Sequence, residues 1–107
     1  MKKLMALLLA AVMLVPAASM AETVVTSFYP IYLLAMNLLE GVGGVELHNL
    51  AAPGTGCLHD YQLSTADMKA LSRADVFLIN GAGMESYLDF ALANLPALPV
   101  VDASVGV

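Results

Sequence analysis

The sequence predicts an α/β fold, a parallel sheet of about four strands with flanking helices. Short apolar or β-branched runs alternate along the chain with segments of helical character. Each link between successive strands is long enough to hold a crossover helix, which makes neighbouring strands parallel. The third of these runs, at residues 76–79, is continuously apolar, as is typical of a strand buried on both faces. This alternation places helices on the faces of one sheet.

The first strand, helix and strand are predicted between residues 23 and 50. Residues 23–27 are rich in β-branched side chains and favour a buried strand. Pro30 suits the first turn of a helix over residues 31–40, where apolar side chains occupy nearly every face. Three glycines between residues 41 and 44 end this helix. Residues 45–50 then form the second strand, which leaves no room for a hairpin back to the first.

The remaining elements follow the same alternation. A helix that runs to about residue 73 is predicted to begin at Ser64 or Thr65, because hydroxyl side chains cap exposed backbone N–H groups. The strand at residues 76–79 comes next. A third helix is predicted over residues 85–95, ahead of the prolines at positions 96 and 99. Residues 100–102 complete the pattern as a fourth strand.

Residues 1–21 have the composition of a cleaved secretory signal rather than of a folded element. Lys2 and Lys3 precede an unbroken apolar run over residues 4–15. Small residues, Ser19 and Ala21, flank Met20 as they do at a signal-peptidase site. The apolar run is short for a membrane span, which makes an uncleaved anchor the less favoured alternative. We therefore predict a mature chain that starts at Glu22.

The excess of acidic side chains restricts the kinds of molecule that the protein can bind. All nine acidic side chains follow residue 21, whereas the basic side chains after it are Lys69 and Arg73, within a formal net charge of −5 for the whole chain. Such a surface cannot neutralise phosphates, so nucleic acid is excluded as a partner and an anionic membrane is disfavoured. A negative surface is compatible with the capture of cations, although it also serves solubility alone.

The candidate site is the loop over residues 52–64, which contains the single cysteine and one of the two histidines. Pro53-Gly54 is a strong turn signal within this loop. A neutral imidazole presented by such a loop is a suitable ligand for a divalent transition metal, and His59 is our candidate. A histidine that bonds only to the backbone is the alternative. The loop follows a strand, as does the loop at residues 80–83, and ligands of parallel sheets gather at the carboxyl ends of strands.

Other side chains near His59 have more than one interpretation. Cys57 is interpreted first as a small residue packed in the loop, second as an additional metal ligand, and third as a nucleophile paired with His59. Asp60 closes a turn or orients the imidazole. Tyr61 is expected to pack its ring and expose its hydroxyl. His48 lies within the second strand and is not counted as a ligand. Glu85 is expected to be an acid of the first turn of the third helix.

The mature sequence resembles the N-terminal portion of the zinc- and manganese-binding periplasmic substrate-binding proteins of ABC transporters. The similarity runs through the mature chain, and it is specific because several short motifs occur together. These motifs are Val24-Val25-Thr26-Ser27-Phe28-Tyr29-Pro30-Ile31-Tyr32, Pro53-Gly54-Thr55 with His59-Asp60-Tyr61, Leu71-Ser72-Arg73-Ala74-Asp75-Val76-Phe77, Asn80-Gly81-Ala82-Gly83-Met84-Glu85 and Val101-Asp102-Ala103-Ser104.

The resemblance implies two α/β lobes joined by a long helix, with the metal held in the cleft by histidines and a carboxylate from both lobes. Of those ligands, His59 alone maps onto this sequence, so we expect residues 22–107 to be a partial N-terminal lobe and the chain to be a truncated fragment. Gly56-Cys57-Leu58 replace the acid and proline that usually precede the histidine, and Gln62 stands where an acid is frequent.

The function implied is extracytoplasmic or periplasmic capture of zinc or manganese and its delivery, by a monomer, to a membrane ABC permease. The protein is then a binding protein and not an enzyme. Two alternatives come from other classes: a small secreted hydrolase that uses Cys57 and His59, and an adhesin of the same fold. Loss of activity on thiol alkylation would favour the hydrolase, and sensitivity to chelators would favour the binding protein.

Overall fold

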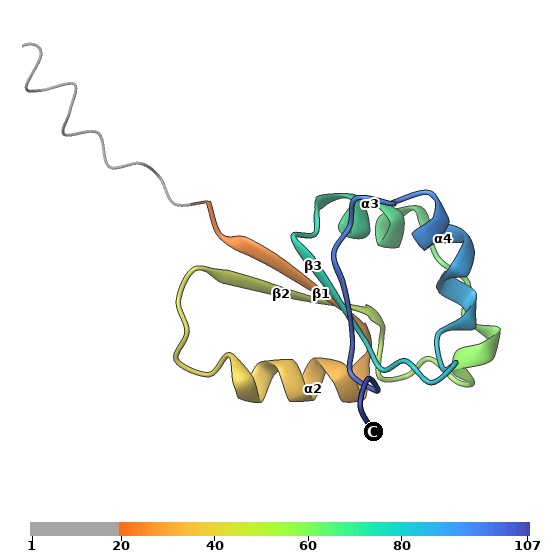
Figure 1. Cartoon of the computed structure of the whole chain (residues 1–107), viewed down its shortest axis with the longest axis horizontal. Helices are drawn as coiled ribbons and strands as arrows, with labels where there is room; N and C mark the ends of the chain where they lie inside the picture. Colours follow the sequence, from red (N-terminus) through yellow and green to blue (C-terminus); the bar gives the residue numbers. More distant parts are fainter. Residues whose placement is uncertain (1–19) are drawn as a thin grey trace, which may run out of the picture.

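Four parallel strands form one sheet in the order β2-β1-β3-β4 (Figure 1). The structure is a computed structural model that describes residues 20–107. The strands are β1 (Glu22–Phe28), β2 (Val45–Ala51), β3 (Val76–Ile79) and β4 (Val100–Asp102). The predicted fold class is confirmed, and each strand lies within two residues of its predicted position. The signal predicted for the start of the chain lies outside the described residues, except for positions 20 and 21.

Three α-helices and two 3-10 turns connect the strands. The helices are α2 (Tyr29–Leu38), α3 (Thr65–Arg73) and α4 (Asp89–Ala93), and the 3-10 turns are η1 (Leu58–Asp60) and η2 (Ser86–Leu88). Helix α2 packs on β1 and β2 from one side of the sheet, whereas α3 and α4 lie on the other side (Figure 1). No helix formed by residues 20–107 is long and apolar enough to cross a membrane.

Helix α3 begins where the hydroxyl residues predict it. The Ser64 hydroxyl accepts a hydrogen bond from the Asp67 backbone N–H at 3.1 Å, and the Asp67 carboxylate accepts one from the Ser64 N–H at 2.8 Å. This reciprocal capping box satisfies two backbone donors that the first turn of a helix would otherwise leave unpaired. It also turns the Asp67 carboxylate back toward the loop that precedes the helix.

The prediction of one helix over residues 85–95 is wrong, because η2 and the short α4 take its place. Glu85 has φ −106° and ψ 43°, which is not a helical conformation. Its carboxylate bonds instead to backbone N–H groups of the preceding loop, so the chain cannot begin a regular helix there. At the other end, α4 stops before Pro96, since a residue that precedes proline avoids the helical conformation.

The main core lies between the sheet and the α3–α4 side. It is built from buried apolar side chains of strands and helices: Val25, Leu50, Leu71, Phe77, Leu88 and Ala91. Val25 and Phe77 are paired across β1 and β3, so they point to the same face. Their strand neighbours point the other way, toward the side of the sheet that carries α2.

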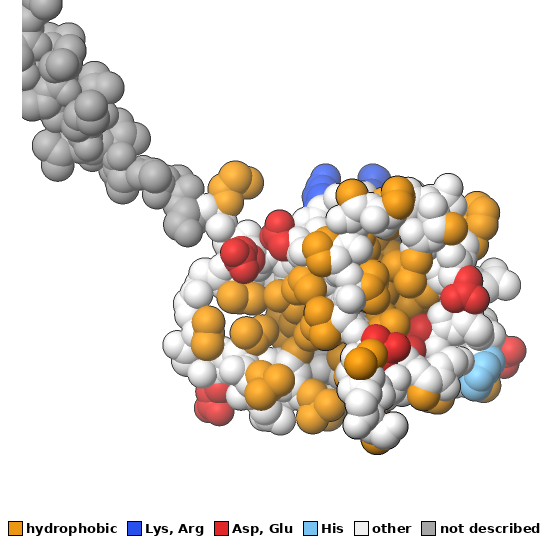
Figure 2. Space-filling model, viewed as in Figure 1, with side chains coloured by type: hydrophobic (Ala, Val, Ile, Leu, Met, Phe, Trp, Pro, Cys, Tyr) orange, Lys and Arg blue, Asp and Glu red, His pale blue; other side chains and the backbone are white. Residues whose placement is uncertain are grey.

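The α2 side of the sheet is less completely covered. Leu34 and Leu38 of α2 are exposed, and so is Val101 of β4. Figure 2 shows hydrophobic side chains gathered on the surface between α2 and α3. Because α2 packs mainly on β1 and β2, the β3–β4 half of this face is less covered in the described part of the chain. The molecule therefore has one well-packed layer and one partly open layer.

Candidate metal centre

Two loops meet at the carboxyl-terminal edge of the sheet. One follows β2 and contains η1, and the other follows β3 and leads into η2. The two 3-10 turns are in contact with each other, although 25 residues or more separate them in sequence order. The parallel-sheet argument predicts this meeting of loops, and the structure shows it. The site is therefore built from segments that follow two different strands.

A β-turn followed by a 3-10 turn presents His59 to solvent. The Thr55 N–H donates to the Ala52 carbonyl at 3.0 Å, which closes the turn around Pro53-Gly54 that the sequence predicts. In η1, the Tyr61 N–H donates to the Leu58 carbonyl at 3.1 Å. His59 is exposed within η1. Its imidazole is therefore free to meet a ligand at the edge of the sheet where the two loops meet.

Cys57 lies beside this imidazole. Its Sγ atom is 3.7 Å from Nδ1 of His59, and both side chains are exposed. The interpretation of Cys57 as a packed residue is therefore wrong, since the extended backbone of Cys57 directs the thiol toward the ring instead of into the loop. Asp60 is exposed and closes η1 through its own N–H, which donates to the Cys57 carbonyl at 3.1 Å.

Tyr61 anchors the histidine loop to helix α3. Its hydroxyl donates to Asp67 Oδ2 at 2.8 Å, and the Leu50 carbonyl oxygen lies 3.2 Å from the Tyr61 hydroxyl oxygen. Burial raises the pKa of Tyr61 to about 12, and the bond to Asp67 and the charge of that carboxylate add to the effect. The expectation that this hydroxyl reaches solvent is wrong, because the capping box has already turned the Asp67 carboxylate toward it.

Glu85 holds the second loop from inside. Its buried carboxylate accepts hydrogen bonds from the Ser27 hydroxyl at 2.8 Å, the Asn80 N–H at 2.6 Å and the Gly81 N–H at 3.0 Å. The expectation that it is an acid of the first turn of a helix is wrong. The Tyr87 hydroxyl donates to the Ser27 carbonyl at 3.1 Å and so ties η2 to the end of β1. Burial raises the pKa of Tyr87, with the charge of Glu85 as the next cause.

Sequence reasoning missed this role of Glu85 and Ser27. The two residues are 58 positions apart, so no local pattern joins them. The available signal was the position of an acid directly after a glycine-rich loop. Backbone N–H groups of such a loop converge, and a carboxylate is the side chain that can accept more than one of them.

Asp102 completes this edge of the sheet from β4. Its carboxylate accepts hydrogen bonds from the Ser104 hydroxyl at 2.6 Å and the Ser104 N–H at 2.7 Å, and these bonds lower the pKa of Asp102. A hollow of about 210 Å³ lies between the second loop, η2 and this carboxylate. The hollow has three acidic residues, Glu85, Asp89 and Asp102, in its lining, but Glu85 is already engaged by the loop.

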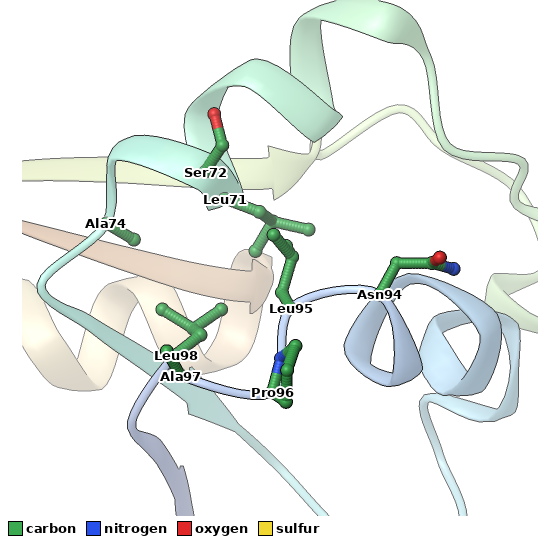
Figure 3. Close-up of a pocket in the computed structure, with 8 residues that line it drawn as sticks. All are labelled: Leu71, Ser72, Ala74, Asn94, Leu95, Pro96, Ala97 and Leu98. Carbon is green, nitrogen blue, oxygen red and sulfur yellow. The ribbon is translucent and has the colours of Figure 1, made fainter.

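His48 and an apolar hollow at the other end of the sheet lie away from this site. His48 is exposed in the middle of β2, where it lines a hollow with Glu46, Lys69 and Arg73. A hollow of about 360 Å³ lies at the amino-terminal edge of the sheet, between the end of α3 and the turn that precedes β4 (Figure 3). No titratable side chain lines it, so it offers no metal ligands.

The described residues do not form a complete metal site. Among residues 20–107, no three side chains of the types His, Cys, Asp and Glu lie close enough together to hold one ion. Zinc normally takes four ligands, and manganese takes more. The described part of the chain therefore offers at most two neighbouring ligands, Cys57 and His59.

Comparisons with known proteins match this chain to proteins that bind metals. The family described as the periplasmic zinc-uptake complex component A, ZnuA, matches residues 24–107. A protein of Thermotoga maritima named as a candidate metal-binding protein is 35% identical over 109 positions, which cover 95% of this chain and 39% of that protein. The high-affinity zinc uptake system protein ZnuA of Brucella abortus is 33% identical over 74 residues, 69% of this chain and 21% of that protein.

A solved structure supports the fold. The Mn-bound periplasmic metal binding protein from Candidatus Liberibacter asiaticus superposes with a TM-score of 0.71 at 25% identity. The superposition covers 80% of this chain and 32% of that chain. This chain thus spans well under half the length of the relatives it matches. On the match over residues 24–107, the chain belongs to the ZnuA family of periplasmic zinc-uptake components.

Proposed function

We propose that the protein captures a divalent transition metal, zinc or manganese, outside the cytoplasmic membrane, with His59 as a ligand. The observation that carries this proposal is the exposed imidazole at the carboxyl edge of the sheet, where the loops after β2 and β3 meet. Neutral imidazole nitrogen is the most common side-chain ligand of protein-bound metals, and it suits zinc in particular. Relatives of this chain include a zinc uptake protein and a manganese-bound binding protein, which supports the same cargo here.

The proposal also covers the remaining metal ligands, the membrane partner and the location of the protein. Because zinc needs about four ligands, donors other than those among residues 20–107 complete its shell, as in a site shared with a second lobe. A monomer of this kind would pass the ion to a membrane ABC permease. The predicted signal at residues 1–21 and cleavage before Glu22 would place it in the periplasm or at the outer cell surface.

The Cys57–His59 pair favours a second candidate, a small secreted hydrolase. A thiol within 3.7 Å of an imidazole nitrogen is the arrangement of a cysteine nucleophile and its base. Alkylation of Cys57 would abolish hydrolysis, and a chelator would leave it unchanged. The binding protein is expected to show no turnover of ester or peptide substrates, with or without alkylation.

Calorimetric titration of the full-length protein, with the remaining metal donors present, tests the main proposal. We expect saturable binding of Zn²⁺ or Mn²⁺ with a stoichiometry of about one ion per chain, and loss of the bound ion on addition of a chelator. Magnesium is the control, because it prefers oxygen ligands and keeps its water shell. If zinc and manganese bind no more tightly than magnesium, the proposed function is wrong.

A further inference from the structure

Cys57 and His59 form a two-ligand unit that the proposed function, which uses His59 alone, leaves partly unexplained. The two side chains project from the start of η1, with one residue between them in sequence. Both are exposed, and Sγ lies 3.7 Å from Nδ1. Thiolate sulfur and imidazole nitrogen are the two most common ligand types of zinc sites.

The separation of these atoms suits one shared metal ion. Zinc lies about 2.3 Å from a thiolate sulfur and about 2.0–2.1 Å from an imidazole nitrogen. At a tetrahedral angle these two bond lengths put sulfur and nitrogen about 3.5–3.6 Å apart. The observed 3.7 Å requires an angle only slightly wider. The side chains therefore need almost no movement to close on an ion, and the loop turns that hold them are already formed.

We propose that Cys57 Sγ and His59 Nδ1 bind the same ion, and that the sulfur selects zinc over manganese. The proposal rests on the proposed function and refines it. Coordination forms a metal–sulfur bond in place of the S–H bond, and the thiol proton passes to solvent. Zinc accepts soft thiolate ligands readily, whereas manganese prefers carboxylate, carbonyl and water oxygens. A sulfur ligand therefore strengthens zinc binding more than manganese binding.

Cobalt substitution tests for the sulfur ligand directly. The full-length protein, with the remaining metal donors present and kept reduced, is loaded with Co²⁺, which takes up the same ligands as zinc and shows a near-ultraviolet charge-transfer band when thiolate is bound. We expect the band in the native chain and no band in Cys57→Ser. Leu58→Ala, which alters the intervening residue and no ligand, is the matched control and should keep the band. A native chain that binds cobalt without the band overturns the proposal.

Affinity separates failure of this proposal from failure of the proposed function. Cys57→Ser should weaken zinc binding by about tenfold or more, while the affinity for manganese stays within about twofold. If Cys57→Ser keeps native zinc affinity while His59→Ala loses it, the shared site is wrong and the proposed function stands. If neither substitution changes zinc affinity, both are wrong. Circular dichroism of each variant verifies that the loop change leaves the fold intact.

Discussion

Gly81 lies where β3 gives way to the second loop, and the absence of a side chain there allows Asp102 of β4 to approach. The residue has φ +78°, a conformation that favours glycine. A Cβ atom placed on Gly81 would overlap the Asp102 carboxylate. Gly83, two residues on, has a similar φ of +79°, but a Cβ there would meet nothing within 4 Å. The two glycines thus separate backbone strain from steric overlap.

Gly81→Ala is therefore expected to destabilise the protein more than Gly83→Ala. Both variants bear the left-handed backbone cost of about 1–2 kcal/mol, and Gly81→Ala adds about 1–3 kcal/mol of overpacking against Asp102. Urea unfolding of the two variants measures the difference in the free energy of unfolding. Equal losses would show that the Asp102 carboxylate moves away freely and that β4 does not fix this edge of the sheet.

At the scale of the element, α3 is defined by its N-terminal cap and by the tyrosine bonded to it. The Asp67 carboxylate serves the Ser64 N–H and hydroxyl as well as the Tyr61 hydroxyl. The helix start and the histidine loop thus share one buried acceptor. Tyr61 and Tyr87 are also in edge-to-face contact, with ring centroids 5.2 Å apart, so η2 joins the same cluster.

Ser64→Ala should cost about 1 kcal/mol in the free energy of unfolding, the usual value for the loss of a capping hydroxyl. The control is Ser72→Ala in the last turn of the same helix, where an exposed hydroxyl donates to the Lys69 carbonyl. That variant should stay within about 0.5 kcal/mol of the native chain. Chemical denaturation of both variants measures the effect, and an equal change would argue against the capping box.

Alkaline pH should weaken the fold through the same tyrosines. An unfolded tyrosine has a pKa of about 10, whereas the pKa of Tyr61 in the folded chain is about 12 and that of Tyr87 is also raised. Above about pH 10 the unfolded chain loses phenolic protons first, so the free energy of unfolding falls as pH rises. Below that pH both states keep these protons and the contribution is constant.

Urea unfolding between pH 8 and about pH 11 measures this dependence. Tyr61→Phe should lower stability at neutral pH but show a smaller further loss at alkaline pH. Tyr29→Phe, which alters an exposed ring on α2, should keep the native slope. If Tyr61→Phe also keeps the native slope, the tyrosine cluster is not the source of the alkaline sensitivity.

Sequence reasoning succeeded for elements whose signals are local and failed where distant contacts decide. The strands, the turn at Pro53-Gly54 and the cap at Ser64 were predictable, because apolar periodicity and turn chemistry act within a few residues. The prediction of a helix over residues 85–95 failed because the Glu85 carboxylate accepts a hydrogen bond from Ser27, a residue of β1 that is distant in sequence. The exposed thiol of Cys57 could not be predicted either, since exposure depends on what the rest of the fold brings over the loop.

At the scale of the whole molecule, the larger cluster of buried apolar side chains lies on one side of the sheet. Phe77 of β3 is fully buried in the core between the sheet and the α3–α4 side, at 0% exposure. Phe90 of α4 is 81% exposed. On the opposite side, α2 packs mainly on β1 and β2. A core of this size is modest, so single losses within it are expected to be large relative to the total.

Phe77→Ala should therefore cost about 3–5 kcal/mol in the free energy of unfolding, whereas Phe90→Ala should change it by about 0.5 kcal/mol or less. Near-ultraviolet circular dichroism and thermal unfolding measure both variants. Native-like unfolding of Phe77→Ala would show that the described core does not stabilise the molecule.

The central claim is that His59, and not His48, meets the metal. Both histidines are exposed, but His59 lies at the carboxyl edge of the sheet and His48 lies within β2. Zinc titration of the full-length protein, with the remaining metal donors present, tests this most directly when His59→Ala is compared with His48→Ala. We expect His59→Ala to weaken zinc binding by about a hundredfold or more, which is about 2.7 kcal/mol of lost binding free energy, and His48→Ala to bind like the native chain. Equal affinities in the two variants would contradict the account.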